Sequence, residues 1–166
     1  KSSRIIYWLT PKEFKYKNKD SLVYIHEKEM RLECYKHFKK DYEKSMLFRN
    51  EVDIRKFAIV QAISNDPEQK YYYLEFGVFM GVSTNFFSKS IKKLYAFDSF
   101  EGLNENWIGT YKPKSTFNKN KELPKLNNNV ELVVGFIQKT LKGFVKEHQP
   151  KINFVHFDMD TYESTI

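Results

Sequence analysis

Short runs of aromatic and apolar residues recur in the second half of the chain, separated by polar stretches. The first run, residues 71–76, reads Tyr-Tyr-Tyr-Leu-Glu-Phe and is the length of one buried strand. Similar runs occupy residues 93–97, 130–134 and 152–157. Two segments that lie between these runs, residues 85–91 and 137–148, have apolar residues at helical spacing. The pattern predicts an α/β fold, a Rossmann-like, doubly wound and mostly parallel sheet with helices on both faces.

Helical spacing also dominates the residues before the first strand. Between about Ile25 and Phe48, an apolar residue recurs every fourth position, at Met30, Cys34, Phe38, Tyr42 and Met46. A second helix is predicted from about Val52 to Ile63. We therefore predict an N-terminal arm and helix over residues 1–50, with residues 1–20 loosely packed, and a nucleotide-binding domain over residues 51–166. Cys34 belongs to the apolar stripe, which places it in a core or an interface, and these helices could pair two copies of the chain.

A glycine turn follows the first strand. Gly77 and Gly81 bracket it, and glycine lets the backbone take positive φ and approach a ligand closely. Ser83 and the two residues after it, Thr84 and Asn85, are of helix N-cap type, so a helix is predicted to start there. Amide hydrogens at this helix start would face an anionic or polar ligand, with the Glu75 carboxylate beside them. Two glycines at this spacing also occur in simple tight packing.

An acidic residue ends the second strand. Asp98 lies 21 residues after Gly77, where doubly wound folds hold a ribose diol. The polar stretch that follows, from Ser99 to Asn129, is too long for a plain connection. It is predicted to be a lid or substrate loop, and a disordered insertion is the alternative. Together, turn and carboxylate indicate a nucleotide-binding site.

The fourth strand ends in two further carboxylates. His156, Asp158 and Asp160 alternate, so their side chains would share one face if the strand stayed extended. Carboxylates at the carboxyl end of a parallel strand lie where such sheets bind ligands, and they suit Mg²⁺ or another divalent ion. The alternative is an acidic N-cap for a helix over residues 162–165. His156 could act as a base, or it could make a structural hydrogen bond.

Composition narrows the class of protein. The chain has 166 residues, 41% of them hydrophobic, and a formal net charge of +7. Among its 28 basic residues only four are Arg, and the lysines are scattered, so nucleic-acid binding is disfavoured. No apolar run approaches a membrane span, and one cysteine suits a reducing compartment, so a cytoplasmic location without membrane contact is predicted.

Four phrases, taken in order, resemble the macrocin O-methyltransferase family of class I S-adenosylmethionine-dependent methyltransferases. They are LEFGVFMGVS from Leu74, AFDSFEGL from Ala96, Gly135-Phe136 with Thr140-Leu141, and HFDMDTYEST from His156. The resemblance covers about residues 52–166. The first fifty residues carry none of it.

The resemblance implies a role for each matching residue. Glu75, Gly77, Gly81 and Ser83 would frame the methionine part of S-adenosylmethionine, Asp98 and Ser99 would bind its ribose, and Gly135 and Phe136 would lie near its adenine. Asp158 and Asp160 match an acidic motif that supplies a ligand to a divalent metal such as Mg²⁺ near the acceptor hydroxyl. Further acidic ligands and the C-terminal strands of the family fold are expected beyond Ile166.

The implied reaction is methyl transfer to a hydroxyl of a small polar acceptor such as a sugar or another natural product. In this reading Asp158, Asp160 and His156 are the candidate catalytic residues. A nicotinamide-dependent oxidoreductase is one alternative, although its turn calls for Gly-x-Gly-x-x-Gly, and Val78 and Phe79 follow Gly77 here. A basic RNA-binding or interaction module without catalytic activity is the other.

Overall fold

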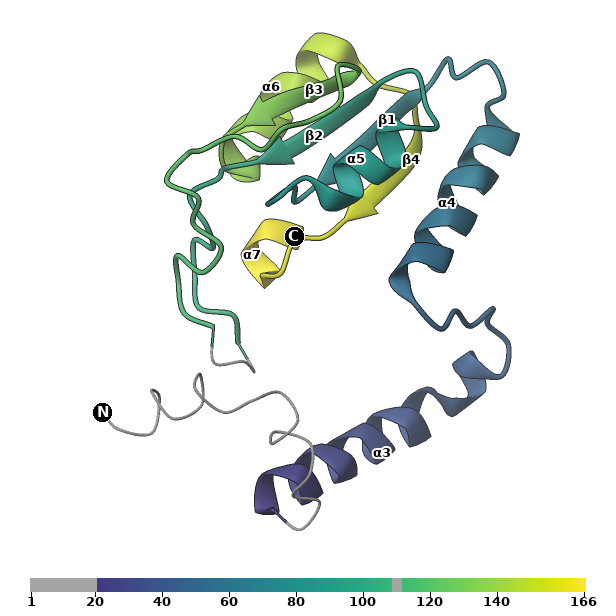
Figure 1. The fold of residues 1–166 in the computed structure, drawn as a ribbon, viewed down its shortest axis with the longest axis vertical. Coiled ribbons are helices and arrows are strands. Elements are labelled where there is room, and N and C mark those ends of the chain that lie inside the picture. Colours follow the sequence, from purple (N-terminus) through teal and green to yellow (C-terminus); the bar gives the residue numbers. More distant parts are fainter. Residues whose placement is uncertain (1–20, 109–111) are drawn as a thin grey trace. The chain divides into compact units, whose positions relative to one another are not determined.

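The computed structural model describes residues 21–108 and 112–166. The chain divides into two compact units, Lys1–Arg49 and Asn50–Ile166. Figure 1 shows the first as a helix and the second as a sheet with its covering helices. The arm predicted for residues 1–20 lies outside the described residues.

Helix α3, Leu22–Tyr42, belongs to the first unit. The Ser21 side chain caps its start by accepting a hydrogen bond from the Tyr24 N–H at 3.1 Å. The helix ends at Tyr42, before the predicted Phe48, and the chain then turns, with the Lys44 N–H donating to the Asp41 carbonyl at 3.2 Å. No residue of α3 is buried. Cys34 is exposed, so it does not lie in a core, and an interface there stays a prediction.

The second unit opens with helix α4, Glu51–Asn65. The Asn50 side chain accepts from the Asp53 N–H at 2.9 Å, and acidic residues in the first turn suit the helix dipole. Ile59 and Ala62 on this helix are buried. The helix covers the range predicted for about Val52 to Ile63, but its Phe57 and Val60 side chains are exposed.

A four-stranded parallel sheet forms the centre of this unit. Its strands are β1 (Tyr72–Phe76), β2 (Leu94–Asp98), β3 (Val130–Val134) and β4 (Ile152–Phe157), in the order β3-β2-β1-β4. All three pairings are parallel. Each strand lies within one residue of its predicted bounds. The predicted α/β class is confirmed.

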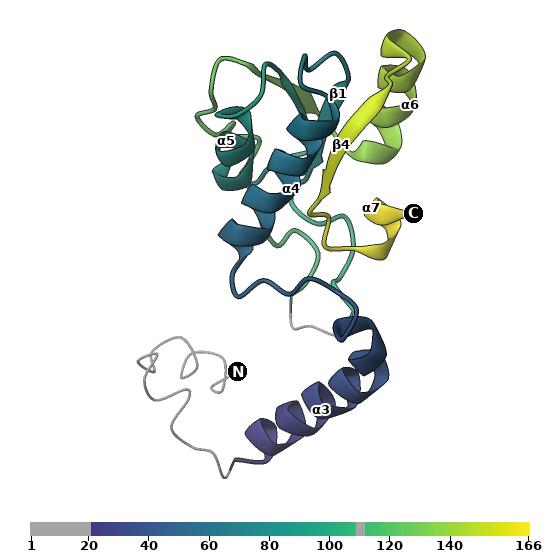
Figure 2. The ribbon, with the colours of Figure 1, turned by 90° about the vertical axis from the view of Figure 1, so that its right-hand side faces the viewer.

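Helices cover both faces of the sheet (Figure 2). On one face Tyr73 and Phe154 pack with α4 and with α5, Val82–Ser88, whose Phe87 is fully buried. On the other face, helix α6, Ile137–His148, inserts Phe144 among the rings of Tyr72, Tyr95 and Phe97. Burying one such aromatic side chain contributes about 1.5–3 kcal/mol. The two cores hold the strand ends in place.

Helix α5 starts earlier than the sequence predicted. Its N-cap is Gly81, in the left-handed conformation at φ 74°, and not a polar side chain. Ser83 and Thr84 lie inside the helix and are buried, so the expected capping role of these residues is wrong. Glycine at the cap allows the sharp turn out of the loop after β1.

The last helix, α7, spans Tyr162–Thr165. Its N-cap position is Thr161, so neither Asp158 nor Asp160 caps it and the N-cap alternative for these carboxylates is wrong.

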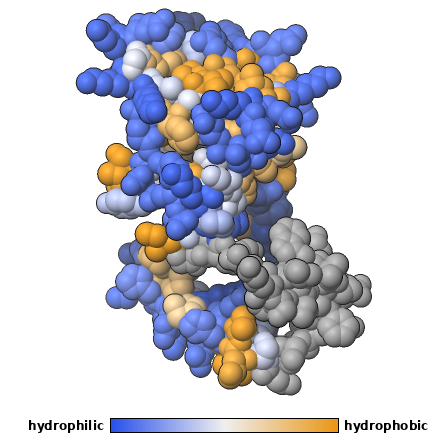
Figure 3. Space-filling model, turned by 90° about the vertical axis from the view of Figure 1, so that its left-hand side faces the viewer, coloured by the Kyte–Doolittle hydropathy of each residue, from blue (hydrophilic) through white to orange (hydrophobic). Residues whose placement is uncertain are grey.

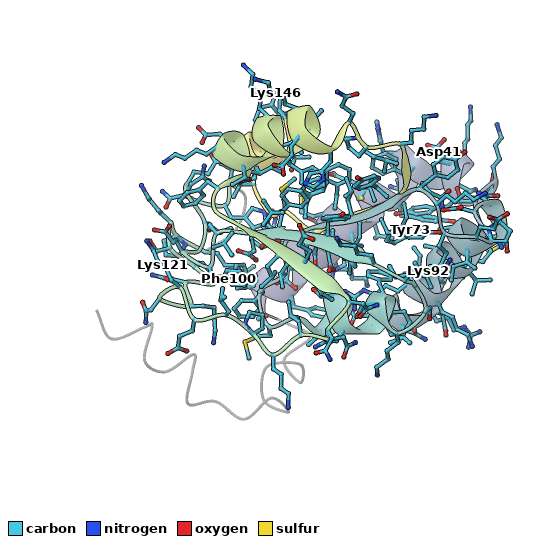
Figure 4. The ribbon with its side chains drawn as sticks, turned by 90° about the horizontal axis from the view of Figure 1, so that it is seen from above. Asp41, Tyr73, Lys92, Phe100, Lys121 and Lys146 are labelled. Carbon is cyan, nitrogen blue, oxygen red and sulfur yellow. The ribbon has the colours of Figure 1, made fainter. Side chains whose placement is uncertain are left out.

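The visible face in Figure 3 is largely hydrophilic, with hydrophobic residues gathered in limited patches. Figure 4 places Phe100 beside Lys121, at the end where β2 finishes, and Tyr73 toward the other end of the sheet.

Candidate active site

The strand order creates a crevice at the carboxyl end of β1. The chain runs from β1 outward through β2 to β3, and then returns to place β4 on the other side of β1. Ligands of open α/β sheets bind at such a switch point. The segments after β1 and β4 approach closely there, because a Cβ at Gly77 would collide with the Asp158 backbone carbonyl.

A pocket of about 290 Å³ lies at this crevice. It is close to the lower end of the usual size range for small-molecule sites. Seven of the predicted site residues line it, namely Gly77, Asp98, Ser99, Gly135, Phe136, Asp158 and Asp160. The sequence therefore identified residues from all four strand ends that the fold brings together.

Asp98 organises the loop after β1. Its Oδ2 accepts from the N–H groups of Val78 and Phe79 at 2.8 Å each, and its Oδ1 accepts from the Phe100 N–H at 2.8 Å. Phe79 and Phe100 both have left-handed backbones, at φ 49° and 56°, which are strained for an aromatic residue. The carboxylate offsets this strain, and at most about one of its four lone-pair positions remains for a ligand.

Two residues expected at the site point elsewhere. Glu75 is fully buried and faces the same side of the sheet as Tyr73, away from the pocket lining. Its Oε1 lies 3.0 Å from His156 Nδ1, and the His156 ring packs edge-on against Phe87. His156 does not line the pocket either. Its contacts are those of a histidine in a structural hydrogen bond.

Gly81 and Ser83 also lie outside the pocket lining. A Cβ at Gly81 would lie 2.5 Å from Leu126 Cδ2. The absence of a side chain at Gly81 therefore leaves room for the loop before β3 to pack. Ser83 is buried in α5. Contact of these two residues with a cofactor stays a prediction.

Asp158 and Asp160 share the pocket. Burial and the charge of Asp158 raise the pKa of Asp160, and the Lys112 ammonium opposes this shift. Among the described residues, no group of three or more His, Cys, Asp or Glu side chains could hold a metal ion. Two carboxylates can bind a Mg²⁺ ion that keeps several water ligands, but they cannot form a site made of protein ligands alone. The Mg²⁺ prediction therefore gains no support here.

Part of the loop after β2, residues 103–108 and 112–116, is called the arm. Leu103 and the Ser115–Thr116 segment exchange backbone hydrogen bonds of 2.9 and 3.0 Å, and the Trp107 N–H donates to the Lys112 carbonyl at 3.0 Å. The described part of this loop is thus folded on itself, and a role as a lid or substrate loop stays a prediction.

Aromatic residues connect the loop after β2 to the glycine turn after β1. The Phe117 ring lies 5.2 Å from the Phe79 ring, and both line the pocket. The Lys112 Nζ lies 4.5 Å from the Trp107 ring centroid and 4.6 Å from that of Phe117. Sequence reasoning missed Phe79, Asn104, Phe117 and Gln138 in the lining. For Asn104 and Phe117, the unusual length of the loop after β2 was the one signal in the sequence.

Residues 74–166 match the model of a family described as a methyltransferase domain. The chain belongs to this family, and it is an S-adenosylmethionine-dependent methyltransferase. This assignment favours methyl transfer over the nicotinamide and RNA-binding alternatives.

The fold is similar to that of a solved structure titled calicheamicin methyltransferase CalS11. The TM-score is 0.55 at 19% identity, over 88% of this chain and 71% of that one. No curated protein matches the chain.

Within residues 21–108 and 112–166, no helix is long and apolar enough to cross a membrane. A cytoplasmic location stays a prediction.

Proposed function

We propose that this methyltransferase transfers the methyl group to a hydroxyl oxygen of a small polar acceptor, such as a sugar or another natural product, as the macrocin O-methyltransferases do. The observation that carries the proposal is that Asp158 and Asp160 line the same pocket as Gly77 and Asp98. Carboxylates at this position can orient a hydroxyl and receive its proton.

The cofactor would lie along the ends of β1, β2 and β3. The loop after Gly77 would hold the methionine part, with its positive sulfonium directed toward the carboxylates. Asp98 and Ser99 would lie at the ribose, and Gly135 and Phe136 at the adenine. The pocket supplies this mixture of backbone, carboxylate and apolar surface.

The reaction needs an oxygen aligned with the methyl group and a destination for one proton. The acceptor oxygen forms a bond to the methyl carbon as the carbon–sulfur bond breaks, and S-adenosylhomocysteine leaves with the bonding electrons. The hydroxyl proton passes to a carboxylate. Asp160 suits this role because its raised pKa lies closer to the working pH than that of an ordinary aspartate. Holding both reactants in one pocket supplies orientation.

Metal assistance is a separate part of the proposal. Asp158 and Asp160 would hold a divalent ion together with water and acceptor oxygens, and the ion would lower the pKa of the acceptor hydroxyl. His156 is assigned no part in proton transfer, since Glu75 and Phe87 engage its ring.

A direct test compares acceptors that differ in the attacked atom. The full chain is incubated with methyl-labelled S-adenosylmethionine and a panel of glycosides and phenols, with matched primary amines as controls. We expect label only on the hydroxyl compounds. Labelled amines with unlabelled hydroxyl compounds would overturn the proposed acceptor class, while calorimetry with S-adenosylhomocysteine checks cofactor binding separately.

A further inference from the structure

Phe117, in the loop after β2, is held at one position by its own chain. Its backbone is left-handed, at φ 67°, which is strained for an aromatic residue. The residues on either side of it lie against Gly102, where a Cβ would be 2.6 Å from the Thr116 carbonyl oxygen and 2.7 Å from the Asn118 nitrogen. The fold of the loop therefore keeps the Phe117 ring in place despite this strain.

The Phe117 ring lies at the pocket beside that of Phe79. Both residues line the pocket, as Asp158 and Asp160 do, and the two ring centroids lie 5.2 Å apart in an edge-to-face contact. The Phe79 backbone is left-handed as well, and 42% of this residue is exposed. Strained aromatic residues that face a pocket instead of a core are typical of a surface that binds a ligand. The loop after β2 and helix α7 lie at the same end of the sheet (Figure 1).

A cation lies against the Phe117 ring. The Lys112 ammonium is 4.6 Å from the centroid of this ring and 4.5 Å from that of Trp107, so two rings hold it. Phe117 lines the pocket and Lys112 does not, so the ammonium and the pocket meet different sides of the ring. Because the ammonium attracts the electron density of the ring face, the side toward the pocket is poorer in electrons than that of an ordinary phenylalanine.

The electron density of this surface determines which acceptor ring packs well on it. A sugar packs on aromatic residues through C–H groups that carry a slight positive charge, and these favour an electron-rich face. A phenol ring is itself rich in electrons, so it stacks better on a face that a cation has depleted. Both classes of acceptor carry the hydroxyl group that the proposed reaction needs.

We infer that Phe117 is a specificity-determining residue that stacks on the acceptor ring and selects a phenol over a sugar, with Phe79 forming the adjoining wall. The inference rests on the proposed methyl transfer to a hydroxyl oxygen, and it narrows the class of acceptor. Lys112 is a positioning residue, since it acts on the acceptor through the Phe117 ring.

The test compares kcat/KM of the full chain for a panel of simple phenols and a panel of methyl glycosides, with methyl-labelled S-adenosylmethionine. We expect the wild type to favour the phenols by at least about ten-fold, and Phe117→Leu to lose at least about three-fold in kcat/KM for phenols alone. Phe117→Tyr keeps the ring and should retain the preference. Lys112→Met keeps an apolar stem without the charge and should lower the ratio of phenol to glycoside methylation.

Tyr71→Leu is the matched control. Tyr71 is an exposed aromatic residue before β1 that does not line the pocket, so its loss should leave both rates unchanged. An equal loss for both panels in Lys112→Met would overturn its action through Phe117. Weaker binding of S-adenosylhomocysteine to Phe117→Leu, measured by calorimetry, would place this ring at the cofactor and overturn its acceptor role.

The wild type separates this inference from the proposed function. Label on glycosides with none on phenols would overturn the selection of a phenol and leave transfer to a hydroxyl oxygen intact. Label on neither panel, with amines labelled instead, would overturn the proposed function and the inference together.

Discussion

Glu75 and His156 lie opposite each other on β1 and β4, with Glu75 Oε1 3.0 Å from His156 Nδ1. Removing the imidazole leaves a fully buried carboxylate without a partner. We expect His156→Ala to lower the free energy of unfolding by about 1–3 kcal/mol, because a buried acceptor loses its hydrogen-bond partner. Glu75→Gln keeps a hydrogen-bonding group and should cost less. Urea unfolding measures both, and a loss below about 1 kcal/mol in His156→Ala would contradict this structural role.

The same Glu75→Gln variant tests the role that the family resemblance implies. If Glu75 framed the methionine part of the cofactor, affinity for S-adenosylhomocysteine would fall markedly. Since the side chain does not line the pocket, we expect the dissociation constant to change less than about three-fold. Calorimetry of the folded variant decides between the two placements.

Asp98→Ala should affect both binding and stability. It removes the acceptor for three backbone N–H groups and frees two strained phenylalanine backbones. We expect a loss of about 1–3 kcal/mol in unfolding free energy and at least about a ten-fold loss of S-adenosylhomocysteine affinity. Glu101→Gln serves as control, because it removes a nearby charge that accepts from none of these three N–H groups. A variant of full stability and reduced affinity would mean that Asp98 acts only on the ligand.

Gly77→Ala tests the close approach of the two segments at the crevice. The new Cβ would lie 2.9 Å from the Asp158 carbonyl carbon, at a backbone φ of 94°. We expect lower stability and lower activity, because Asp158 must move. Gly143→Ala is the control, since its Cβ meets nothing within 4 Å in a helix. It should raise stability by about 0.5–1 kcal/mol. Similar melting temperatures for both variants would refute the packing argument.

Asp66, at the end of α4, gives the stability a dependence on pH. Burial alone would raise its pKa, but the N–H donors of Lys70 and Tyr71, both 2.9 Å away, outweigh burial and lower it. A lowered pKa in the folded state means that the ionised carboxylate stabilises the fold above the ordinary carboxyl range. This contribution disappears as the pH falls.

We therefore expect Asp66→Asn to be less stable than wild type near pH 7, with the difference shrinking toward about pH 3. Urea unfolding at both pH values measures the change. Glu122→Gln, at an exposed carboxylate on the loop before β3, is the control. A difference that is independent of pH would show that Asp66 acts without its charge.

The accuracy of sequence-based prediction differed between strands and loops for a physical reason. Buried parallel strands are apolar on both faces, so a run such as residues 93–97 marks its own bounds to within one residue. The start of α5 was misplaced because Gly81 caps it through backbone conformation, which leaves no polar side chain as a signal. Glu75 was predicted at the site by its position, but the alternation of β1 turns it to the opposite face.

The pocket residues on the arm had no comparable signal. Asn104 meets Glu163 across 59 positions of sequence, and this contact depends on how the loop folds. Asp98 was found from its distance to Gly77, yet its three backbone partners follow from the turn geometry after β1 and β2. Local patterns therefore predicted the strand ends, while the side of the pocket formed by the loop required the tertiary structure.

The final prediction separates a metal role from a proton-accepting role for Asp158 and Asp160. Binding of Mn²⁺, followed by electron paramagnetic resonance, replaces Mg²⁺ with a visible probe of similar ligand preference. If the carboxylates hold the ion, Asp158→Asn and Asp160→Asn should each weaken Mn²⁺ binding at least about ten-fold and leave S-adenosylhomocysteine binding unchanged. Glu122→Gln, an exposed acid on the loop before β3, is the control and should bind Mn²⁺ as wild type does.

Methyl transfer before and after EDTA then assigns the chemistry. With a metal role, EDTA abolishes transfer and added Mg²⁺ restores it, because the ion holds the acceptor oxygen and lowers its pKa. Transfer that survives EDTA but fails in Asp160→Asn means that the carboxylate receives the proton without a metal, in keeping with its raised pKa. Full activity in both Asn variants would remove Asp158 and Asp160 from the catalytic site.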